Sequence, residues 1–193
     1  MRFAVVLLLV CASCISRSAA DAPAYAITPT HSSIKFSVKA SVALVGKFDA
    51  WIATLTFSSP DVTTAVLEVT IQADSVDTGS GMKNRKLMSK DFFDVQNNPT
   101  ITFKSTKIVR TGPNTFEVDG DFTIRGMSNP EKLTLMLSSH HPDSGEIEGK
   151  MIFDRKNYGM TKGIPFIHIA DHVEVNFNLK IKRVGGPPLI LKQ

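Results

Sequence analysis

The sequence has few cysteines, little excess charge and no long apolar run after its first residues. Both cysteines, Cys11 and Cys14, lie within the first twenty residues, which leaves the rest of the chain without a thiol nucleophile or a disulfide. No second apolar run approaches the length that crosses a membrane. Without Arg2 and Arg17, 20 basic residues stand against 18 acidic ones. This excess is too small to indicate nucleic acid as a partner.

Catalytic and cofactor motifs are missing as well. The sequence contains no Gly-x-Ser-x-Gly elbow, no phosphate-binding glycine loop and no Cys-x-x-Cys-His haem motif. His168 and His172 have a metal-ligand spacing only for a helix, whereas Pro165 predicts a loop that leads into a strand. His140 and His141 are adjacent in an expected turn, where they cannot easily converge on one ion. We therefore expect no catalytic residues, no metal and no cofactor.

The first twenty residues have the pattern of a secretory signal peptide. Arg2 precedes an apolar run, Phe3 to Val10, and small residues follow at Ser18, Ala19 and Ala20. We expect residues 1–20 to be removed on export, with the periplasm as the destination and secretion as the alternative. Residues 21–184 are then long enough for one domain with a substantial core, and residues 185–193 are expected to form a flexible tail.

Alternating apolar and polar residues predict about eight strands joined mostly by short turns. Such a meander either packs as two sheets or closes on itself. Long strands and glycines within them favour an eight-stranded antiparallel barrel, with a sandwich as the alternative. The strand residues expected to face the interior are Phe36, Val38, Leu67, Val69, Ile71, Ile101, Phe103, Phe122, Ile124, Leu135, Phe153, Val175 and Phe177.

Three places in the strands need a local interpretation. The pattern from Gly46 to Phe57 is irregular and predicts a bulge. In the next region, Ser105 and Lys107 are expected to share a face with the inward Phe103. The segment from Gly126 to Pro130 has turn residues and predicts a connection between two strands.

One stretch breaks the alternation. Residues 81–90 mix apolar and basic side chains without period 2, and they predict a short amphipathic helix. Phe92 and Phe93 follow as two large apolar side chains, and we interpret helix and phenylalanines as a lid over one end of the sheet structure. The alternative is that they merely cover a core edge. Asp91 and Asp94 flank the phenylalanines, either as an acid pair or, as we favour, as caps for backbone N–H groups.

Several segments in order resemble the YceI-like family of exported bacterial proteins, over essentially the whole of residues 21–184. They are Thr30-His31-Ser32-Ser33-Ile34-Lys35-Phe36, Gly46-Lys47-Phe48, Ser75-Val76-Asp77-Thr78-Gly79, Leu87-Met88-Ser89-Lys90-Asp91-Phe92-Phe93-Asp94, Asn98-Pro99-Thr100-Ile101-Thr102-Phe103, Gly120-Asp121-Phe122-Thr123-Ile124-Arg125-Gly126 and Asp154-Arg155-Lys156-Asn157-Tyr158-Gly159-Met160. The resemblance implies a lipocalin-like barrel with a helix near one opening and a long isoprenoid or other lipid inside. Lys39, Lys156 and Tyr158 depart from the residues usual in the family, which bears on the head group that is recognised.

Cations near the expected opening are candidates to meet a polar head group through charge-assisted hydrogen bonds. The candidates are Arg85, Arg155 and Lys156, with Lys83 and Lys86 on the same predicted helix. The alternative for each is a solvated surface charge.

Two function hypotheses from different classes remain at this point. The leading one is a carrier or scavenger of an isoprenoid-type lipid, such as a polyprenyl compound or a quinone. The rival is a structural or interaction protein whose barrel is filled by its own side chains, which the many phenylalanines also fit. A hydrolase of lipid esters that depends on Asp91 or His31 is a weaker third hypothesis, and whether the chain forms a homodimer is left open.

Overall fold

The computed structural model describes residues 22–41, 44–163 and 168–190. The expected signal peptide lies outside the described residues. Most of the described chain is in strands, and it also contains the helix α1 (Gly81–Met88) and four short 3-10 helices. The strands are β1 (Ala24–Ile27), β2 (Ser33–Ala40), β3 (Leu44–Phe48), β4 (Trp51–Thr56), β5 (Val66–Gln72), β6 (Val76–Asp77), β7 (Thr100–Arg110), β8 (Thr115–Ile124), β9 (Met127–His141), β10 (Ser144–Asp154) and β11 (Ile169–Gly185). The 3-10 helices are η2 (Pro29–His31), η3 (Val62–Thr64), η4 (Ala73–Ser75) and η5 (Arg155–Tyr158).

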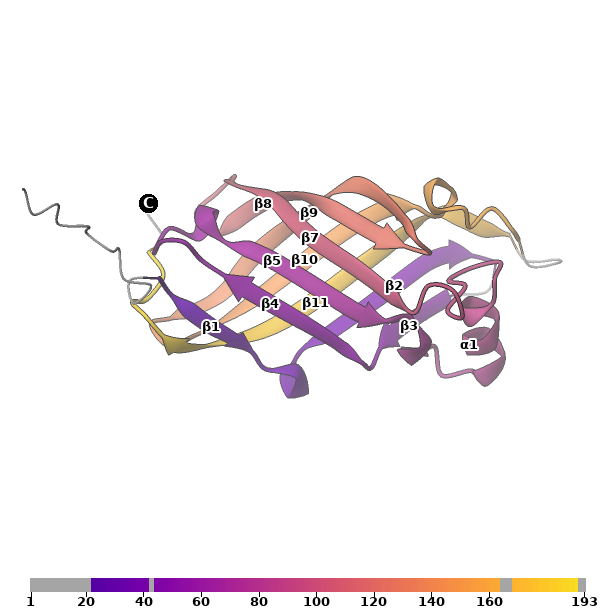
Figure 1. The fold of residues 1–193 in the computed structure, drawn as a ribbon, viewed down its shortest axis with the longest axis horizontal. Coiled ribbons are helices and arrows are strands. Elements are labelled where there is room, and N and C mark those ends of the chain that lie inside the picture. Colours follow the sequence, from indigo (N-terminus) through magenta and orange to yellow (C-terminus); the bar gives the residue numbers. More distant parts are fainter. Residues whose placement is uncertain (1–21, 42–43, 164–167, 191–193) are drawn as a thin grey trace, which may run out of the picture.

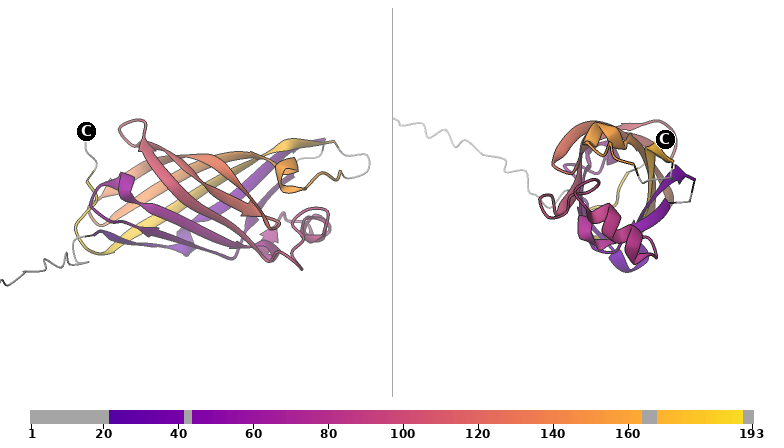
Figure 2. Two further views of the ribbon diagram at one scale, coloured as in Figure 1. Left: turned by 45° about the horizontal axis from the view of Figure 1, so that its top comes forward. Right: turned by 90° about the vertical axis from the view of Figure 1, so that its right-hand side faces the viewer.

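The strands form one antiparallel sheet that closes into a barrel, as Figures 1 and 2 show. Its order is β1-β4-β5-β7-β8-β9-β10-β11-β2-β3-β6, and pairing of β1 with β11 completes the circle. Three barrel strands are interrupted, because β1 continues into β2, β3 into β4, and β5 into β6 with matching registers. Counted as continuous strands, these elements make the predicted eight-stranded barrel.

The interruptions coincide with residues that disturb a regular ladder. Pro29, which lacks an N–H group, begins η2 between β1 and β2. Between β3 and β4 the chain breaks at Asp49 and Ala50, which corresponds to the irregularity predicted after Gly46. The Asp49 N–H donates to the Ser75 carbonyl at 3.1 Å, and the Ala50 carbonyl accepts from the Gln72 N–H at 2.9 Å, so one backbone group of each residue at the break stays paired.

Alternation within the strands places the apolar side chains inside the barrel. On β8, Phe116, Val118, Phe122 and Ile124 are buried, while Asp121 between them is exposed. The same period-2 pattern appears on β7, β9 and β10, and the buried side chains form a single core along the barrel axis. The barrel interior is therefore the centre of the molecule's hydrophobic stabilisation.

Two local expectations are wrong. A bulge lies between Ser105 and Lys107 in the pairing of β7 with β8, and it turns Lys107 outward while Ile108 becomes buried. The connection between β8 and β9 is a two-residue turn at Arg125 and Gly126, so β9 begins at Met127 rather than after Pro130. Arg125 and Gly126 have φ angles of 56° and 71°, so both turn residues have the left-handed backbone conformation. A two-residue type I′ hairpin turn requires a positive φ at both of these positions.

The two ends of the barrel are covered differently. At one end, α1 and the residues after it lie at the opening, and η5 lies at the same end on the opposite side (Figure 2). At the other end, residues 186–190 follow β11 and pack against the barrel. Leu189 is buried, and the Ile190 N–H donates to the Pro60 carbonyl at 2.9 Å. The described part of the expected flexible tail is therefore attached to the barrel.

Candidate functional site

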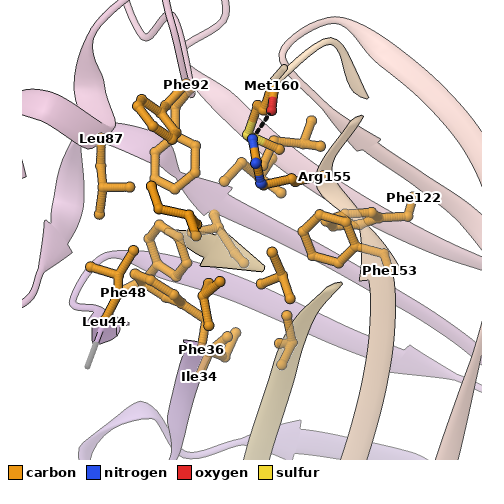
Figure 3. Close-up of a pocket in the computed structure, with 18 residues that line it drawn as sticks. Ile34, Phe36, Leu44, Phe48, Leu87, Phe92, Phe122, Phe153, Arg155 and Met160 are labelled. Carbon is orange, nitrogen blue, oxygen red and sulfur yellow. Dashed lines mark hydrogen bonds between the residues drawn. The ribbon is translucent and has the colours of Figure 1, made fainter. Parts of the chain in front are cut away.

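Within the described part of the chain, three apolar chambers follow one another along the axis of the barrel. The first chamber, at the α1 end, has a volume of about 70 Å³, the middle chamber about 50 Å³ and the far chamber about 40 Å³. Figure 3 shows side chains from the barrel wall and from α1 converging on the first chamber. Each chamber is larger than a water molecule needs, but apolar walls of this kind leave such a space dry.

Shared lining residues show that neighbouring chambers adjoin one another. The first and middle chambers share Ile34, Ile71, Phe122 and Val175, and the middle and far chambers share Leu67. Leu189 belongs to the lining of the far chamber and therefore helps to close that end. Of the described residues that line the three chambers, Arg155 alone is polar or charged. The interior therefore suits a hydrocarbon chain and offers almost nothing to a polar group.

All fifteen predicted interior residues line a chamber. Ten of them border the first chamber: Phe36, Val38, Ile71, Phe92, Phe93, Ile101, Phe122, Ile124, Phe153 and Val175. The others border the middle or far chamber: Leu67, Val69, Phe103, Phe177 and Leu135. Strand alternation also places Ile34, Leu133 and Leu179 on the apolar faces, although they were not among the residues predicted to contact a ligand. It contained no signal for Leu87, Met160 and Leu189, which lie outside the strands.

We call residues 81–95 the lid, because α1 and the turn after it cover the first chamber. Leu87, Phe92 and Phe93 are buried and line that chamber. The Phe93 N–H donates to the Leu87 carbonyl at 2.9 Å, which folds the phenylalanines back under the helix. Phe93 also packs against Phe48 of β3, with ring centroids 6.0 Å apart. The aromatic side chains thus fasten the lid from inside.

Polar contacts fasten the lid from outside. Asn84 on α1 accepts hydrogen bonds from the Thr78 N–H at 2.9 Å and from the Thr78 hydroxyl at 2.6 Å. Arg125, in the β8–β9 turn, donates to the Lys90 carbonyl at 2.9 Å and to the Gly159 carbonyl at 2.5 Å. One guanidinium therefore joins the end of the lid to the segment after η5.

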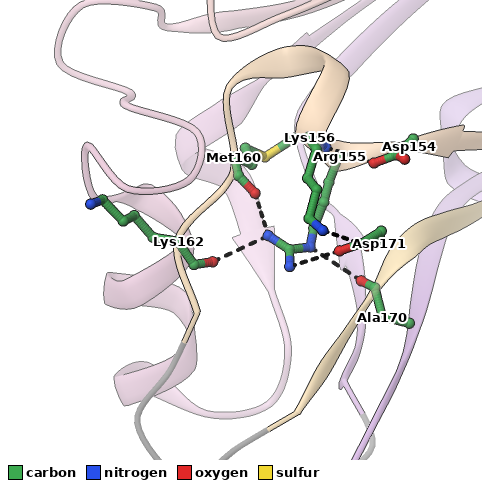
Figure 4. Close-up of polar contacts among 7 residues, drawn as sticks. All are labelled: Asp154, Arg155, Lys156, Met160, Lys162, Ala170 and Asp171. Atoms are coloured by element: carbon green, nitrogen blue, oxygen red, sulfur yellow. Dashed lines mark hydrogen bonds and ion pairs between the residues drawn. The ribbon is translucent and has the colours of Figure 1, made fainter.

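Arg155 is 7% exposed and lies in the wall of the first chamber. Its Nε donates to the Ala170 carbonyl and one Nη to the Lys162 carbonyl, both at 3.1 Å, as Figure 4 shows. The same Nη also donates to the Met160 carbonyl, and the other Nη donates to Asp171 at 3.1 Å. The guanidinium thus links β10, the segment after η5 and the start of β11. Most of its donors are already used inside the protein.

The other predicted head-group cations lie on the outside of the α1 end. Arg85 is exposed on α1, and Lys156 is exposed on η5, where it pairs with Asp171 at 2.7 Å. This hydrogen bond from Lys156 is the main reason that the pKa of the Asp171 carboxyl is lowered. Lys86 pairs with Asp91 at 2.8 Å, which lowers the pKa of that carboxyl in the same way. The structure thus brings the predicted cations to one end of the barrel but not onto one point.

Tyr158 is completely buried beside the first chamber. Its ring packs edge-on against Phe122 and Phe153, with centroids 5.4 and 5.3 Å away, and its hydroxyl donates to Glu131 at 2.8 Å. Burial, and secondly this hydrogen bond, raises the pKa of the Tyr158 hydroxyl. Tyr158 therefore acts as an uncharged anchor for η5.

The carboxylates and histidines considered for chemistry do not come together. Asp91 pairs with Lys86, whereas Asp94 accepts from the side chain of Asn97 at 3.0 Å, so in these contacts the partners are side chains rather than the backbone N–H groups that we predicted. His31 is exposed in η2 on the barrel wall. Within residues 22–41, 44–163 and 168–190 no group of three or more histidines, cysteines or carboxylates is placed to hold a metal. In the same ranges no helix is long and apolar enough to span a membrane.

Comparison with known proteins adds relatives to this geometry. The family model described as YceI-like domain matches residues 25–181. A UPF0312 protein of Pseudomonas aeruginosa is 28% identical over 137 residues, which cover 67% of this chain and 71% of that protein. A UPF0312 protein of Pseudomonas paraeruginosa is 30% identical with the same coverage.

Solved structures share the barrel. BcnA of Burkholderia cenocepacia aligns with a TM-score of 0.72 and 24% identity, covering 80% of this chain and 98% of that one. A domain from Saccharophagus degradans, described as polyisoprenoid binding, aligns with a TM-score of 0.63 and 14% identity over 83% of this chain and 99% of its own. Because these sequence identities are low, the likeness to the solved structures establishes only the fold. The chambers described above were observed in this chain and are not inferred from those structures.

Proposed function

Because this chain belongs to the YceI-like domain family, we propose that it is an exported protein that binds an isoprenoid-type lipid, a polyprenyl compound or a quinone, in its barrel. The observation that carries the proposal is the series of apolar chambers along the axis, in which Arg155 is the one charged lining residue among those described. The Saccharophagus degradans domain, which has the same fold and is described as polyisoprenoid binding, supports the ligand class. Transport, storage or protection against stress are the roles that such binding serves.

The hydrophobic effect is large enough for this task without any polar recognition. Each methylene moved from water into an apolar interior contributes about 0.8 kcal/mol. About fifteen buried methylenes therefore contribute about 12 kcal/mol, which leaves about 8 kcal/mol, the free energy of a micromolar complex, after an association cost of about 4 kcal/mol. A lipid tail in this barrel needs no reaction to be held, so the proposed role is binding rather than catalysis.

Export and the orientation of the ligand belong to the same proposal. The signal-peptide pattern of residues 1–20 supports the periplasm as the location, with secretion as the alternative. The tail of the lipid lies in the chambers, and its head lies at the α1 end. Arg85 and Lys156 face outward there and are in reach of water, whereas Arg155 is engaged with the protein.

Native mass spectrometry of the exported protein, purified from a bacterial periplasm and followed by organic extraction, tests the proposal. We expect one long-chain isoprenoid or related amphiphile per chain. The rival, a barrel filled by its own side chains that binds another protein, draws support from the small chamber volumes. A mass without ligand that stays unchanged after addition of quinones and polyprenyl phosphates would favour the rival.

A substitution inside the barrel gives a second test with a neighbouring control. Phe122 lines both the first and the middle chamber, whereas Thr123 follows it on the outward face of β8. We expect Phe122→Asp to abolish lipid uptake, because a carboxylate in an apolar chamber is strongly unfavourable. Thr123→Asp should bind as the unchanged protein does. Normal uptake by a folded Phe122→Asp variant, with circular dichroism as the check on folding, would contradict binding in the interior.

A further inference from the structure

Three phenylalanine rings inside the barrel lie directly over glycines of a neighbouring strand. Phe36 of β2 pairs with Gly46 of β3, and a Cβ atom at Gly46 would be 2.6 Å from the Phe36 ring. Phe177 of β11 pairs with Gly149 of β10, and a Cβ atom there would overlap the Phe177 ring. In both pairs the phenylalanine ring occupies the space that a side chain on the glycine would fill.

The third ring, Phe103 of β7, lies over Gly120 of β8, where a Cβ atom would overlap it. Phe103 and Phe177 both line the middle chamber. An inward phenylalanine normally projects toward the axis of a barrel, but a glycine on the next strand lets its ring lie against the wall. The two pairs therefore keep the middle chamber open at a place where two large side chains would otherwise fill it.

We infer that the pairs Gly149–Phe177 and Gly120–Phe103 set the bore of the middle chamber, so that the barrel takes one slender extended hydrocarbon chain that threads past both rings. This inference rests on the proposed function and names the shape of its ligand. The middle chamber has a volume of about 50 Å³. We therefore expect a slender linear or methyl-branched chain to pass the rings and a rigid fused-ring lipid to be excluded at this depth.

The path past the rings is long enough to distinguish ligands by length. Along β11 after the irregularity that follows Ile169, the lining runs from Val173 in the first chamber to Ile181 in the far chamber. This stretch is about 26 Å of strand, or about 20 Å along the axis at the tilt usual for barrels. A short chain is held in the first chamber alone, while a long chain has to pass Phe177. Removing the glycine should therefore affect long chains selectively.

Gly149→Ala is the sharpest variant, because the three atoms nearest to the added Cβ all belong to the Phe177 ring, which can move toward the axis. At Gly120, by contrast, the Lys104 carbonyl is also only 2.6 Å from an added Cβ. We expect Gly149→Ala to weaken the binding of solanesol, a long polyprenol, by at least about tenfold. Its binding of farnesol, a short one, should stay within about twofold of the unchanged protein. Native mass spectrometry with both alcohols in competition measures the two changes.

Further variants separate a blocked bore from general damage. Gly149→Ala combined with Phe177→Leu should recover solanesol binding, because the smaller side chain leaves room for the added methyl group. Gly185→Ala is the control, since its Cβ would be 3.9 Å from the nearest side-chain atom, an ordinary contact. If Gly149→Ala does not fold, Phe177→Leu alone still tests the inference: it should admit cholesterol, which the unchanged protein excludes.

The outcomes distinguish this inference from the proposed function. If the unchanged protein binds neither alcohol, nor n-octadecanol as a linear counterpart, the lipid-binding function itself is wrong. If it binds solanesol and a folded Gly149→Ala variant binds both alcohols normally, or loses both alike, the lipid function stands and the bore inference is wrong. Unchanged exclusion of cholesterol by Phe177→Leu would also overturn it.

Discussion

At the scale of single residues, Arg155 shows how a charged group can sit inside an apolar wall. Its guanidinium donates to the carbonyls of Met160, Lys162 and Ala170, which follow η5 or begin β11, and to Asp171. The planar fork of arginine carries five donors on three nitrogens in a fixed geometry, whereas a lysine has three donors on a single nitrogen. Arg155 therefore organises the rim of the first chamber, and it does so without a ligand.

Replacing Arg155 should destabilise the folded protein even when no ligand is bound. We expect Arg155→Met to lower the free energy of unfolding by about 3 kcal/mol or more, because buried carbonyls lose their donor. Lys156→Met is the control, since Lys156 is exposed and its partner Asp171 is partly solvated, and its loss should be much smaller. Urea unfolding of the ligand-free proteins measures both. Equal losses would show that Arg155 is not the organising group.

At Ser105, the strand contains a bulge that the alternation of the sequence did not predict. The alternation predicted that Lys107 shares the inner face with Phe103, but the bulge shifts the alternation and buries Ile108 instead. The buried Ser105 hydroxyl accepts a hydrogen bond from the Leu67 N–H at 2.9 Å, which pairs a backbone donor at this place. A bulge depends on the partner strand, so the local sequence does not predict it. The free-energy cost of burying a lysine nevertheless argued against an inward Lys107.

At the scale of elements, the lid was predictable but its fastening was not. The break in alternation located α1, and Phe92 and Phe93 indicated the direction in which it packs. The contact from Arg125 to the Lys90 carbonyl joins residues that are far apart in the sequence. It also depends on a turn whose first residue has a positive φ, which is unusual for arginine. No local sequence pattern predicts such a contact.

Releasing Arg125 should loosen the lid and leave the barrel intact. Arg125→Asn keeps a residue that tolerates the left-handed backbone but removes the contacts with the Lys90 and Gly159 carbonyls, of which only the first involves the lid. We expect amide exchange of residues 89–95 to become about tenfold faster, the effect of losing about one hydrogen bond. Exchange in β7 to β10 should stay unchanged. Hydrogen–deuterium exchange with mass spectrometry measures both regions, and Arg110→Asn in another hairpin is the control. Unaltered exchange in the lid would mean that its aromatic contacts suffice.

At the scale of the whole molecule, the eight-stranded barrel was predictable because every strand repeats the same signal. Residues such as Phe36, Phe122 and Phe177 each mark an inward face. Closure is favoured because an open sheet of such strands would leave an uncovered edge strand with unpaired backbone groups. The division of the interior into chambers was not predictable. It depends on rings such as Phe103 lying over a glycine of the next strand, and on Leu189 returning to the far end after the last strand. Both are contacts between distant parts of the chain.

The far end offers a test of closure by two adjacent residues. Leu189 is 7% exposed and lines the far chamber, whereas Ile190 is 51% exposed. We expect Leu189→Ala to lower the free energy of unfolding by about 2–3 kcal/mol, because it removes buried methyl groups and leaves a cavity. Ile190→Ala should cost less than about 0.5 kcal/mol, as substitutions of exposed side chains usually do. Urea unfolding measures both variants. Similar losses would mean that the segment after β11 does not seal the barrel, because sealing requires the buried leucine and not its exposed neighbour.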